Sequence, residues 1–187
     1  MPAASPHLVL ATRPLAVKVA AVIAGTAFLA LASQIEVPMV PVPMTIQTLA
    51  VTLVGAAYGW RLAAVTVIAW LAEAMIGLPV LSGGAAGAHH FVGPTAGYLW
   101  AFPFAAALVG WLSERGWSGP NFVRSFFAAA LGNVFCLAIG GAYLASIIGF
   151  EQALAAGVTP FIVGAVLKSG LHAALLKGVD SVRSKRS

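Results

Sequence analysis

Residues 14–33 read PLAVKVAAVIAGTAFLALAS, an apolar run with a single charged side chain, Lys18. Its length is about the 20 residues that an α-helix needs to cross the hydrocarbon core of a bilayer. The run is followed at 34–43 by QIEVPMVPVP. The prolines of that stretch lack an amide hydrogen and have a fixed φ, so they cannot continue the helix. We interpret 14–33 as a retained first membrane span rather than a cleaved secretory signal, followed by an irregular loop at 34–44.

The composition of the chain also indicates a membrane protein. Of the 187 residues, 60% are hydrophobic and 8% are charged, whereas a soluble domain carries roughly 25% charged residues. The net charge of +5 does not indicate a nucleic-acid partner, because the basic residues lie at predicted helix ends and in the C-terminal tail, without interleaved aromatic residues. The single cysteine, Cys136, excludes an internal disulfide and a cysteine-based metal site. We predict no metal centre.

Glycine and proline divide the apolar sequence into segments, and we predict an all-α bundle of six transmembrane helices in one domain, 1–187. The predicted spans are about 14–33, 45–59, 62–77, 96–112, 123–149 and 159–177, with a basic tail at 178–187. Spans two to four are shorter than the usual crossing of about 20 residues. Non-helical backbone at membrane depth is tolerated only beside protein or a water-filled cavity. We therefore expect the loops 34–44 and 77–95 to wall a binding cavity, and the alternative is two long surface loops.

The distribution of cations predicts the orientation of the chain. Three loops on one side of the predicted bundle, 34–44, 78–95 and 150–158, contain no Lys or Arg. Cytoplasmic loops carry an excess of these residues, so we predict that both termini are cytoplasmic, as an even number of spans requires. Nine of the ten cations then lie at cytoplasmic positions: Arg13, Lys18, Arg61, Arg115, Arg124, Lys177, Arg183, Lys185 and Arg186.

The tenth cation, Lys168, lies about nine residues into the sixth predicted span. A lysine at the centre of a membrane helix costs about 2.5–3.5 kcal/mol on the insertion scale, so such a residue is a functional-site hypothesis by default. Two structural alternatives are an ion pair with Glu73 and a side chain that reaches out to the interface.

Several familiar catalytic and metal-binding motifs are missing. Gly164 and Lys168-Ser169 resemble part of a phosphate loop, but Leu167 occupies the position of the required second glycine. No G-x-S-x-G nucleophile turn is present. His89 and His90 are adjacent, so they cannot form the i, i+4 zinc pair of a helix, although they can still contact a ligand. We predict no catalytic residue and no ATP bound through this chain.

Span one carries small residues at four-residue spacing, Ala16, Ala20 and Ala24. Small residues on one face of a membrane helix allow a second helix to approach closely. The stripe indicates either ordinary packing within this protein or a docking surface for another one.

Five stretches follow one another along the chain: VPMVPVPMTIQTLAV at 37–51, GLPVLSGG at 77–84, GPTAGY at 93–98, LGN at 131–133 and GVTPF at 157–161, which leads into Lys168. In this order and spacing they resemble the BioY family, the biotin-binding S-components of energy-coupling-factor transporters. The resemblance implies a six-helix subunit whose pocket lies near the outer face, capped by the first loop and lined by the third and fifth. It also implies a transmembrane coupling protein and two ATPases as partners, with ATP hydrolysed only by those subunits.

The same resemblance implies that the Ala16, Ala20 and Ala24 stripe docks on the coupling protein. One position departs from the family pattern, because family members commonly carry an acidic residue where this chain has Ala165. Either Glu73 compensates for the missing carboxylate, or the ligand is held without it.

Biotin chemistry suggests which side chains line the pocket. The amide of Asn133 or Gln47 can pair with the ureido group in both senses, and the alternatives are an interhelical bond for Asn133 and a cap or loop contact for Gln47. The carboxylate needs Lys168 or the backbone N–H groups of the glycine-rich 82–87 stretch. Aromatic walls are expected from Trp70, Tyr98, Trp100 and Phe102. The predicted substrate-binding set is Gln47, Thr48, Gly83, Gly84, Tyr98, Asn133 and Lys168, with Glu73 and Trp70 as accessory residues.

We therefore predict a multi-pass protein of the bacterial cytoplasmic membrane that captures biotin from outside and delivers it inward without a chemical step. It would contact membrane lipid and act with the coupling protein and the two ATPases, or alone as an oligomer. The alternatives are an S-component for another small vitamin, an intramembrane enzyme and a structural membrane subunit.

Overall fold

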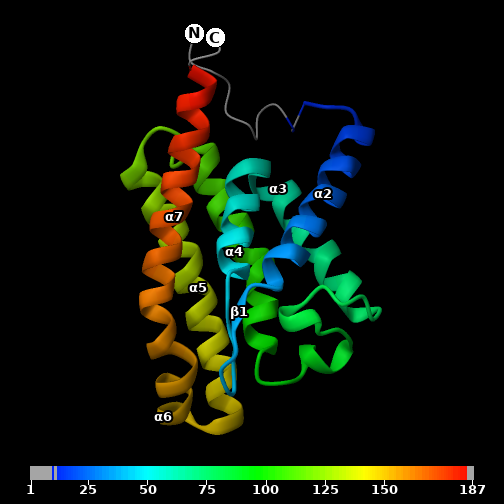
Figure 1. The fold of residues 1–187 in the computed structure, drawn as a ribbon, viewed down its shortest axis with the longest axis vertical. Helices are drawn as coiled ribbons and strands as arrows, with labels where there is room; N and C mark the ends of the chain where they lie inside the picture. The colour runs from blue at the N-terminus through cyan, green and yellow to red at the C-terminus, as the bar shows by residue number, and fades with distance from the viewer. Residues whose placement is uncertain (1–9, 11, 185–187) are drawn as a thin grey trace.

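The computed structural model describes residue 10 and residues 12–184, and it is predominantly helical (Figure 1). A short two-stranded hairpin and two 3₁₀ turns interrupt the helices. In chain order the elements are α2 (Leu15–Ser33), β1 (Glu36–Val37), β2 (Met44–Thr45), α3 (Gln47–Met75), η1 (Ser82–Gly84), η2 (Ala88–Phe91), α4 (Ala96–Glu114), α5 (Phe122–Ile148), α6 (Phe150–Ala153), the π-helical turn η3 (Leu154–Val158) and α7 (Thr159–Ser184).

Within the described residues, five helices are long and apolar enough to cross a membrane, where the sequence predicts six spans. The predicted spans 45–59 and 62–77 both lie in α3. This helix is broken at Gly59, whose φ of 76° and ψ of 168° are not helical and suit glycine because it has no Cβ. Figure 1 shows α3 turning back on itself, with a cyan half that rises and a green half that descends. Each half is shorter than the usual crossing of about 20 residues.

The turn of α3 packs tightly against α4. A Cβ atom at Gly110 would lie 2.5 Å from the Trp60 backbone nitrogen, so only glycine permits this approach. The Trp60 N–H also donates to Glu114 Oε1 at 3.2 Å, at the end of α4. The break in α3 is therefore fixed by α4, which packs against both α3 and α5.

The last predicted loop and the predicted tail both differ from the structure. Residues 150–158, expected as a loop, form α6 and η3 and lead directly into α7. Gly149 ends α5 with a φ of 88°, and Pro160 lies in the first turn of α7, where a proline is tolerated. Helix α7 continues past Lys177 to Ser184, so most of the predicted tail is helical. The predicted cytoplasmic cations Lys185 and Arg186 lie outside the described residues.

The fold is all-helical as predicted, apart from a short hairpin in the first loop, which is therefore not wholly irregular. Strands β1 and β2 pair antiparallel, with Glu36 opposite Thr45 and Val37 opposite Met44. The Ile46 N–H donates to Ile35 O at 3.1 Å, which closes the base of the hairpin.

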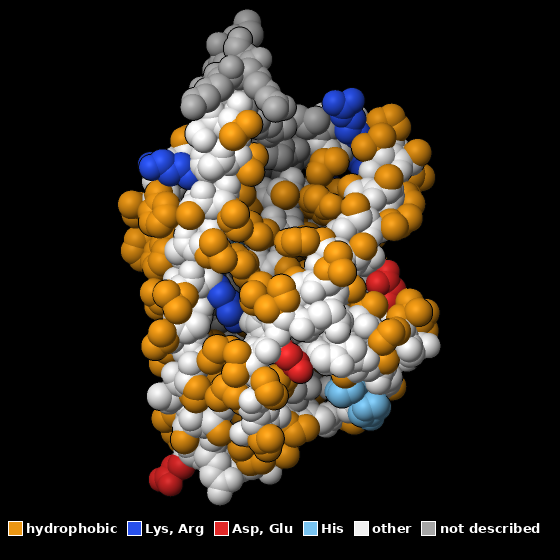
Figure 2. Space-filling view, in the orientation of Figure 1, with side chains coloured by type: hydrophobic (Ala, Val, Ile, Leu, Met, Phe, Trp, Pro, Cys, Tyr) orange, Lys and Arg blue, Asp and Glu red, His pale blue; other side chains and the backbone are white. Residues whose placement is uncertain are grey.

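The three cation-free segments lie at one end of the molecule. Figure 1 places the hairpin, the η1–η2 loop and α6 at its lower end, opposite the turn of α3 and the last turns of α7. In Figure 2 the visible Lys and Arg side chains lie mainly toward the upper end and the His side chains toward the lower one. The fold thus separates charge along its long axis, as the sequence predicts.

Large apolar side chains are exposed along α2 and α7, for example Leu15, Ile23, Val163 and Leu167. A soluble monomer rarely exposes apolar surface of this extent, whereas lipid contacts it without cost. The buried core, which includes Trp70 and Leu144, lies between these outer helices.

Candidate functional site

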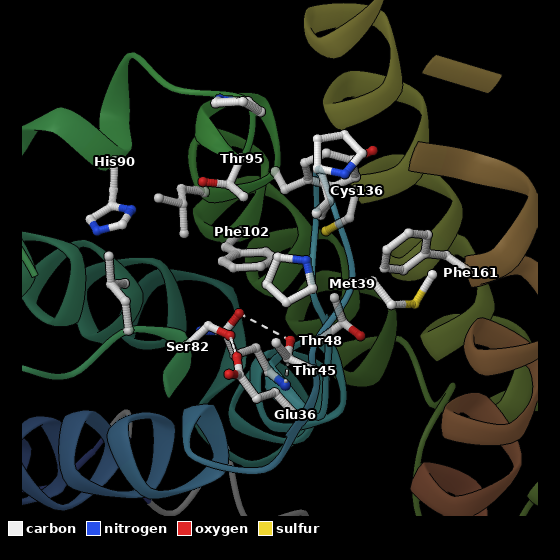
Figure 3. A pocket seen from close by; sticks show the side chains of 18 of the residues that line it. Glu36, Met39, Thr45, Thr48, Ser82, His90, Thr95, Phe102, Cys136 and Phe161 are labelled. Carbon is white, nitrogen blue, oxygen red and sulfur yellow. Dashed lines mark hydrogen bonds between the residues drawn. The ribbon is translucent and has the colours of Figure 1, made fainter. Parts of the chain in front are cut away.

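A cavity of about 550 Å³ lies between the hairpin loop, the η1–η2 loop and the helices α3, α4, α5 and α7. Figure 3 shows His90 on one side of it, Phe161 on the other and Phe102 between them, with Glu36 and Ser82 close together. Both loops that the sequence singles out, 34–44 and 77–95, contribute lining residues. We divide the lining into an inner wall, formed by Thr48, Asn133 and Lys168 on the helices, and a mouth, formed by Glu36, Ser82, His89 and His90 on the loops.

The inner wall joins three helices through side-chain hydrogen bonds. Lys168 Nζ on α7 donates to Thr48 Oγ1 on α3 at 3.0 Å. Asn133 Nδ2 on α5 donates to Ser169 Oγ at 3.1 Å. Asn133 is 3% exposed, and its amide carbonyl is the acceptor that these bonds leave available to a ligand. Three of the predicted site residues, Thr48, Asn133 and Lys168, are therefore brought together.

In the structure Glu73 does not pair with Lys168, and compensation for Ala165 by Glu73 stays a prediction without a contact that supports it. The ammonium bonds to Thr48, and Glu73 does not line the cavity, whereas Ala165 and Lys168 do. Glu73 lies near the end of α3, where its backbone carbonyl accepts from Leu78 N–H at 3.0 Å. Among the described residues that line the cavity, the only carboxylate is that of Glu36, on the first loop.

Gln47 lines the cavity, but its amide is used within the protein. Its Nε2 donates to Ser33 Oγ at 3.0 Å, and its Oε1 accepts from Thr45 Oγ1 at 3.0 Å. The side chain is 5% exposed. Gln47 thus ties the end of α2 to the hairpin, which agrees with the loop-contact alternative for this residue.

Gly83 and Gly84 are not among the lining residues, although Ser82 beside them is. The turn uses its own N–H groups, because Gly84 N donates to Leu81 O at 3.1 Å and Ala85 N to Ser82 O at 3.1 Å. Gly83 has a φ of 62°, and a Cβ there would lie 2.8 Å from Glu36 Oε1. Ser82 Oγ donates to Glu36 Oε2. The glycine is needed so that the carboxylate can sit over the turn, which is a role that the sequence did not reveal.

The aromatic wall differs in part from the prediction. Tyr98, Phe102 and Phe161 line the cavity, and the hydroxyl of Tyr98 donates to Gly157 O at 2.6 Å. Trp70 is fully buried behind Phe102, with 6.0 Å between ring centroids, and its Nε1 donates to Val80 O. Trp100 is 46% exposed and is not a lining residue.

His89 and His90 line the cavity at its mouth, with ring centroids 4.1 Å apart. Burial and the neighbouring His89 lower the pKa of His90 below its ordinary value. His90 is therefore a neutral imidazole near pH 7, able to donate or accept a hydrogen bond.

Several lining residues were not predicted from sequence: Glu36, Thr45, Ser82, Thr95, Cys136 and Phe161. Glu36 carried a usable signal, because it is the only charged residue of the 34–44 loop. Phe161 lies in the GVTPF motif at 157–161, whose sequence alone gives no indication of a ligand contact.

The predicted docking stripe lies on the outer surface of α2. Ala16, Ala20 and Ala24 are all exposed, whereas Gly25 and Leu29 on the opposite face are buried. The stripe is therefore not explained by packing within this chain.

Comparisons with known proteins agree on one family. The model of the BioY family matches residues 5–185. A biotin transporter BioY from Rhizobium etli is 42% identical over 159 residues, which cover 81% of this chain and 84% of that protein. A probable biotin transporter BioY from Pyrococcus horikoshii is 35% identical over 145 residues, covering 76% and 85%. The crystal structure of the S-component for biotin from an ECF-type ABC transporter superposes with a TM-score of 0.78 at 28% identity, covering 91% of this chain and 95% of that one.

Proposed function

This chain belongs to the BioY family, and from that premise we propose that it is a biotin uptake protein of the cytoplasmic membrane. It binds biotin from outside and delivers it inward as the S-component of an energy-coupling-factor transporter, and it catalyses no chemical step. The observation that carries this proposal is the likeness to the biotin S-component over 91% of the chain.

The cavity suits a ligand of this size and chemistry. Its volume of about 550 Å³ falls within the roughly 300–1,000 Å³ of small-molecule sites. Tyr98, Phe102 and Phe161 offer apolar surface to the fused rings and the valeryl chain of biotin. The carbonyl of Asn133 can accept a ureido N–H, and the Lys168 ammonium can donate to a carboxylate or to the ureido carbonyl.

We further propose that the two halves of α3 are separate crossings, which gives six spans with both termini in the cytoplasm. The turn at Gly59 and the cation-free lower end support this orientation. The cavity then opens to the outside under the 34–44 and 78–95 loops. A cysteine at position 86, in a Cys136→Ala background, should react with an impermeant thiol reagent on intact cells. Labelling only after membrane rupture would reverse the orientation.

The partners proposed for this chain are a transmembrane coupling protein and two ATPase subunits, which hydrolyse the ATP. The exposed Ala16, Ala20 and Ala24 stripe is the proposed docking face, because small residues allow close helix approach. Ala20→Trp should prevent co-purification with the coupling subunits while biotin binding to the isolated chain survives. Val163→Trp, on the exposed face of α7, is the matched control. Full-yield co-purification of Ala20→Trp would remove the stripe from the interface.

The departure at Ala165 keeps one alternative open, an S-component for a different small vitamin. To distinguish biotin from another vitamin as the ligand, radiolabelled biotin is titrated into the purified, detergent-solubilised chain, with thiamine and riboflavin as competitors. We expect saturable binding that excess unlabelled biotin removes and the other two vitamins leave intact. Displacement by thiamine or riboflavin, or no saturable biotin binding, would contradict the proposal.

A further inference from the structure

Two polar side-chain pairs join α3 and α7, one helical turn apart. The first is the bond from Lys168 Nζ to Thr48 Oγ1, at 3.0 Å. The second joins His172 Nδ1 and Thr52 Oγ1, also at 3.0 Å. Residues four apart lie on one face of a helix. The Lys168–Thr48 and His172–Thr52 pairs therefore lie one helical turn apart on the facing surfaces of α7 and α3. His172 and Thr52 do not line the cavity, whereas Lys168 and Thr48 do.

The direction of the hydrogen bond between His172 and Thr52 follows from the hydroxyl of Thr52. That hydroxyl donates its one hydrogen to Leu49 O at 2.9 Å, so it accepts from His172, whose proton is therefore on Nδ1. His172 is fully buried, and its Nε2 is a buried acceptor without a partner in the structure. An unpaired buried acceptor is unfavourable, and a leucine would avoid that cost. What a histidine provides and a leucine cannot is the hydrogen bond from Nδ1 to Thr52.

Helix α7 packs mainly against α5 and makes fewer contacts with α3. Its residues Val166, Leu167 and Leu171 are about half exposed or more, and lipid contacts of that kind set neither rotation nor height. The buried Ser169 links α7 to Asn133 on α5. His172 provides the corresponding link to α3, one turn after Lys168 along α7. Residue 165 is an alanine, so no carboxylate at that position orients the ammonium.

We propose that His172 is a positioning residue for the biotin site. Its bond to Thr52 fixes the rotation and height of α7 against α3, so that the Lys168 ammonium stays on Thr48 in the inner wall. This role rests on the proposed function, in which Lys168 contacts the ligand; His172 itself contacts no ligand. The geometry of a ligand-binding cation is thus set by a neutral imidazole that lies outside the cavity.

Three substitutions of His172 test whether its hydrogen bond to Thr52, and not its packing alone, positions Lys168. His172→Asn keeps an N–H donor near the position of Nδ1, His172→Gln moves the donor toward the position of Nε2, and His172→Leu removes it. Loss of one such hydrogen bond should weaken biotin binding up to about tenfold in His172→Leu and His172→Gln. His172→Asn should bind within about threefold of the unchanged protein. Thr52→Val removes the same bond from α3 and should reproduce the leucine result.

The experiment is calorimetric titration of biotin into each full-length variant in detergent, with a thermal melt of the same samples. Thr66→Val is the matched control, because Thr66 is equally buried on α3 but bonds only to Leu62 O of its own helix. It should leave affinity unchanged. Repeating His172→Leu in a Lys168→Met background should give no further loss, because the residue acts through Lys168.

Three outcomes would overturn the role of His172. They are unchanged affinity in a folded His172→Leu protein, equal losses in His172→Asn and His172→Leu, and a loss that is fully additive with Lys168→Met. The first of these counts against the role even when the variant melts at a lower temperature. If the unchanged protein fails to bind biotin, the proposed function itself is wrong, and the titration series separates that result from the others.

Discussion

The inner wall and the mouth of the cavity are built in different ways. The inner wall consists of side chains on three packed helices, and its bonds join residues far apart in sequence, such as Lys168 to Thr48 and Asn133 to Ser169. The mouth consists of loop residues, and its central contact is the bond from Ser82 to Glu36 over the turn at Gly83.

This difference predicts a division of roles. Helix-borne groups are held by tertiary packing and keep their geometry when the ligand leaves, so they should determine affinity. Loop-borne groups are held by a few bonds between loops and can separate when a ligand passes, since local opening is easiest where few apolar contacts are made. The mouth should therefore affect the rates of association and dissociation more than their ratio.

The largest expected effect tests the inner wall. Lys168→Met keeps similar volume and removes the charge, and loss of a charge-assisted hydrogen bond costs about 1.5–3 kcal/mol. That is about ten- to a hundredfold in affinity for biotin by calorimetry. Lys177→Met, on an exposed turn of the same helix, is the control and should bind normally. Normal affinity in a folded Lys168→Met protein would remove Lys168 from the site, whereas a lower melting temperature alone would indicate a purely structural lysine.

Asn133→Leu should have the next largest effect. It removes the acceptor for a ureido N–H and also the bond to Ser169, so we expect a dissociation constant for biotin about tenfold larger. Ser169→Ala breaks only the internal bond and serves as the comparison, with a loss of less than about threefold. Equal losses in the two variants would mean that Asn133 acts through helix packing rather than through the ligand.

The sequence predicted the inner wall better than the mouth, for a physical reason. A lysine or asparagine inside an apolar helix is unfavourable in lipid, so Lys168 and Asn133 stand out without any structure. The same argument applied to His172 would have identified it, because it is also an ionisable residue within a membrane helix. The spans were predicted for a similar reason, since length and hydropathy reflect the bilayer directly.

The sequence could not predict how the helices are rotated or how the loops fold back. Glu73 was considered as a partner of Lys168, but it is not among the residues that line the cavity. The contact of Glu36 with Ser82 depends on the hairpin register and on Gly83, neither of which has a local signature. Likewise, the predicted spans 45–59 and 62–77 imply a reversal near Gly59, but not the tight packing of that turn against Gly110.

Glu36→Gln tests whether the mouth controls exchange. The amide keeps the size and loses the charge that strengthens the bond from Ser82. We expect biotin to dissociate about threefold faster and to associate faster as well, with a dissociation constant changed by less than about twofold. Stopped-flow chase of labelled biotin measures both rates. Ser82→Ala should give the same pattern. A change in affinity without a change of both rates in the same direction would contradict the proposal that the mouth controls exchange and the inner wall controls affinity.

The smallest effect concerns pH at the mouth. Burial and His89 lower the pKa of His90, so the imidazole is neutral at pH 7 and gains a proton only as pH falls below its ordinary value of about 6.5. The stability associated with neutral His90 is thus present above that pH and declines as pH falls through the lowered pKa.

The added positive charge should attract the carboxylate of biotin, which like that of glutamate stays ionised well above about pH 4.3. The association rate should therefore rise by up to about twofold between pH 7 and pH 5, because His90 is only partly buried and its charge is screened by solvent. His90→Gln should flatten part of this pH dependence while leaving the rate at pH 7 unchanged. A rise of the same size in His90→Gln would assign the effect to another group at the mouth.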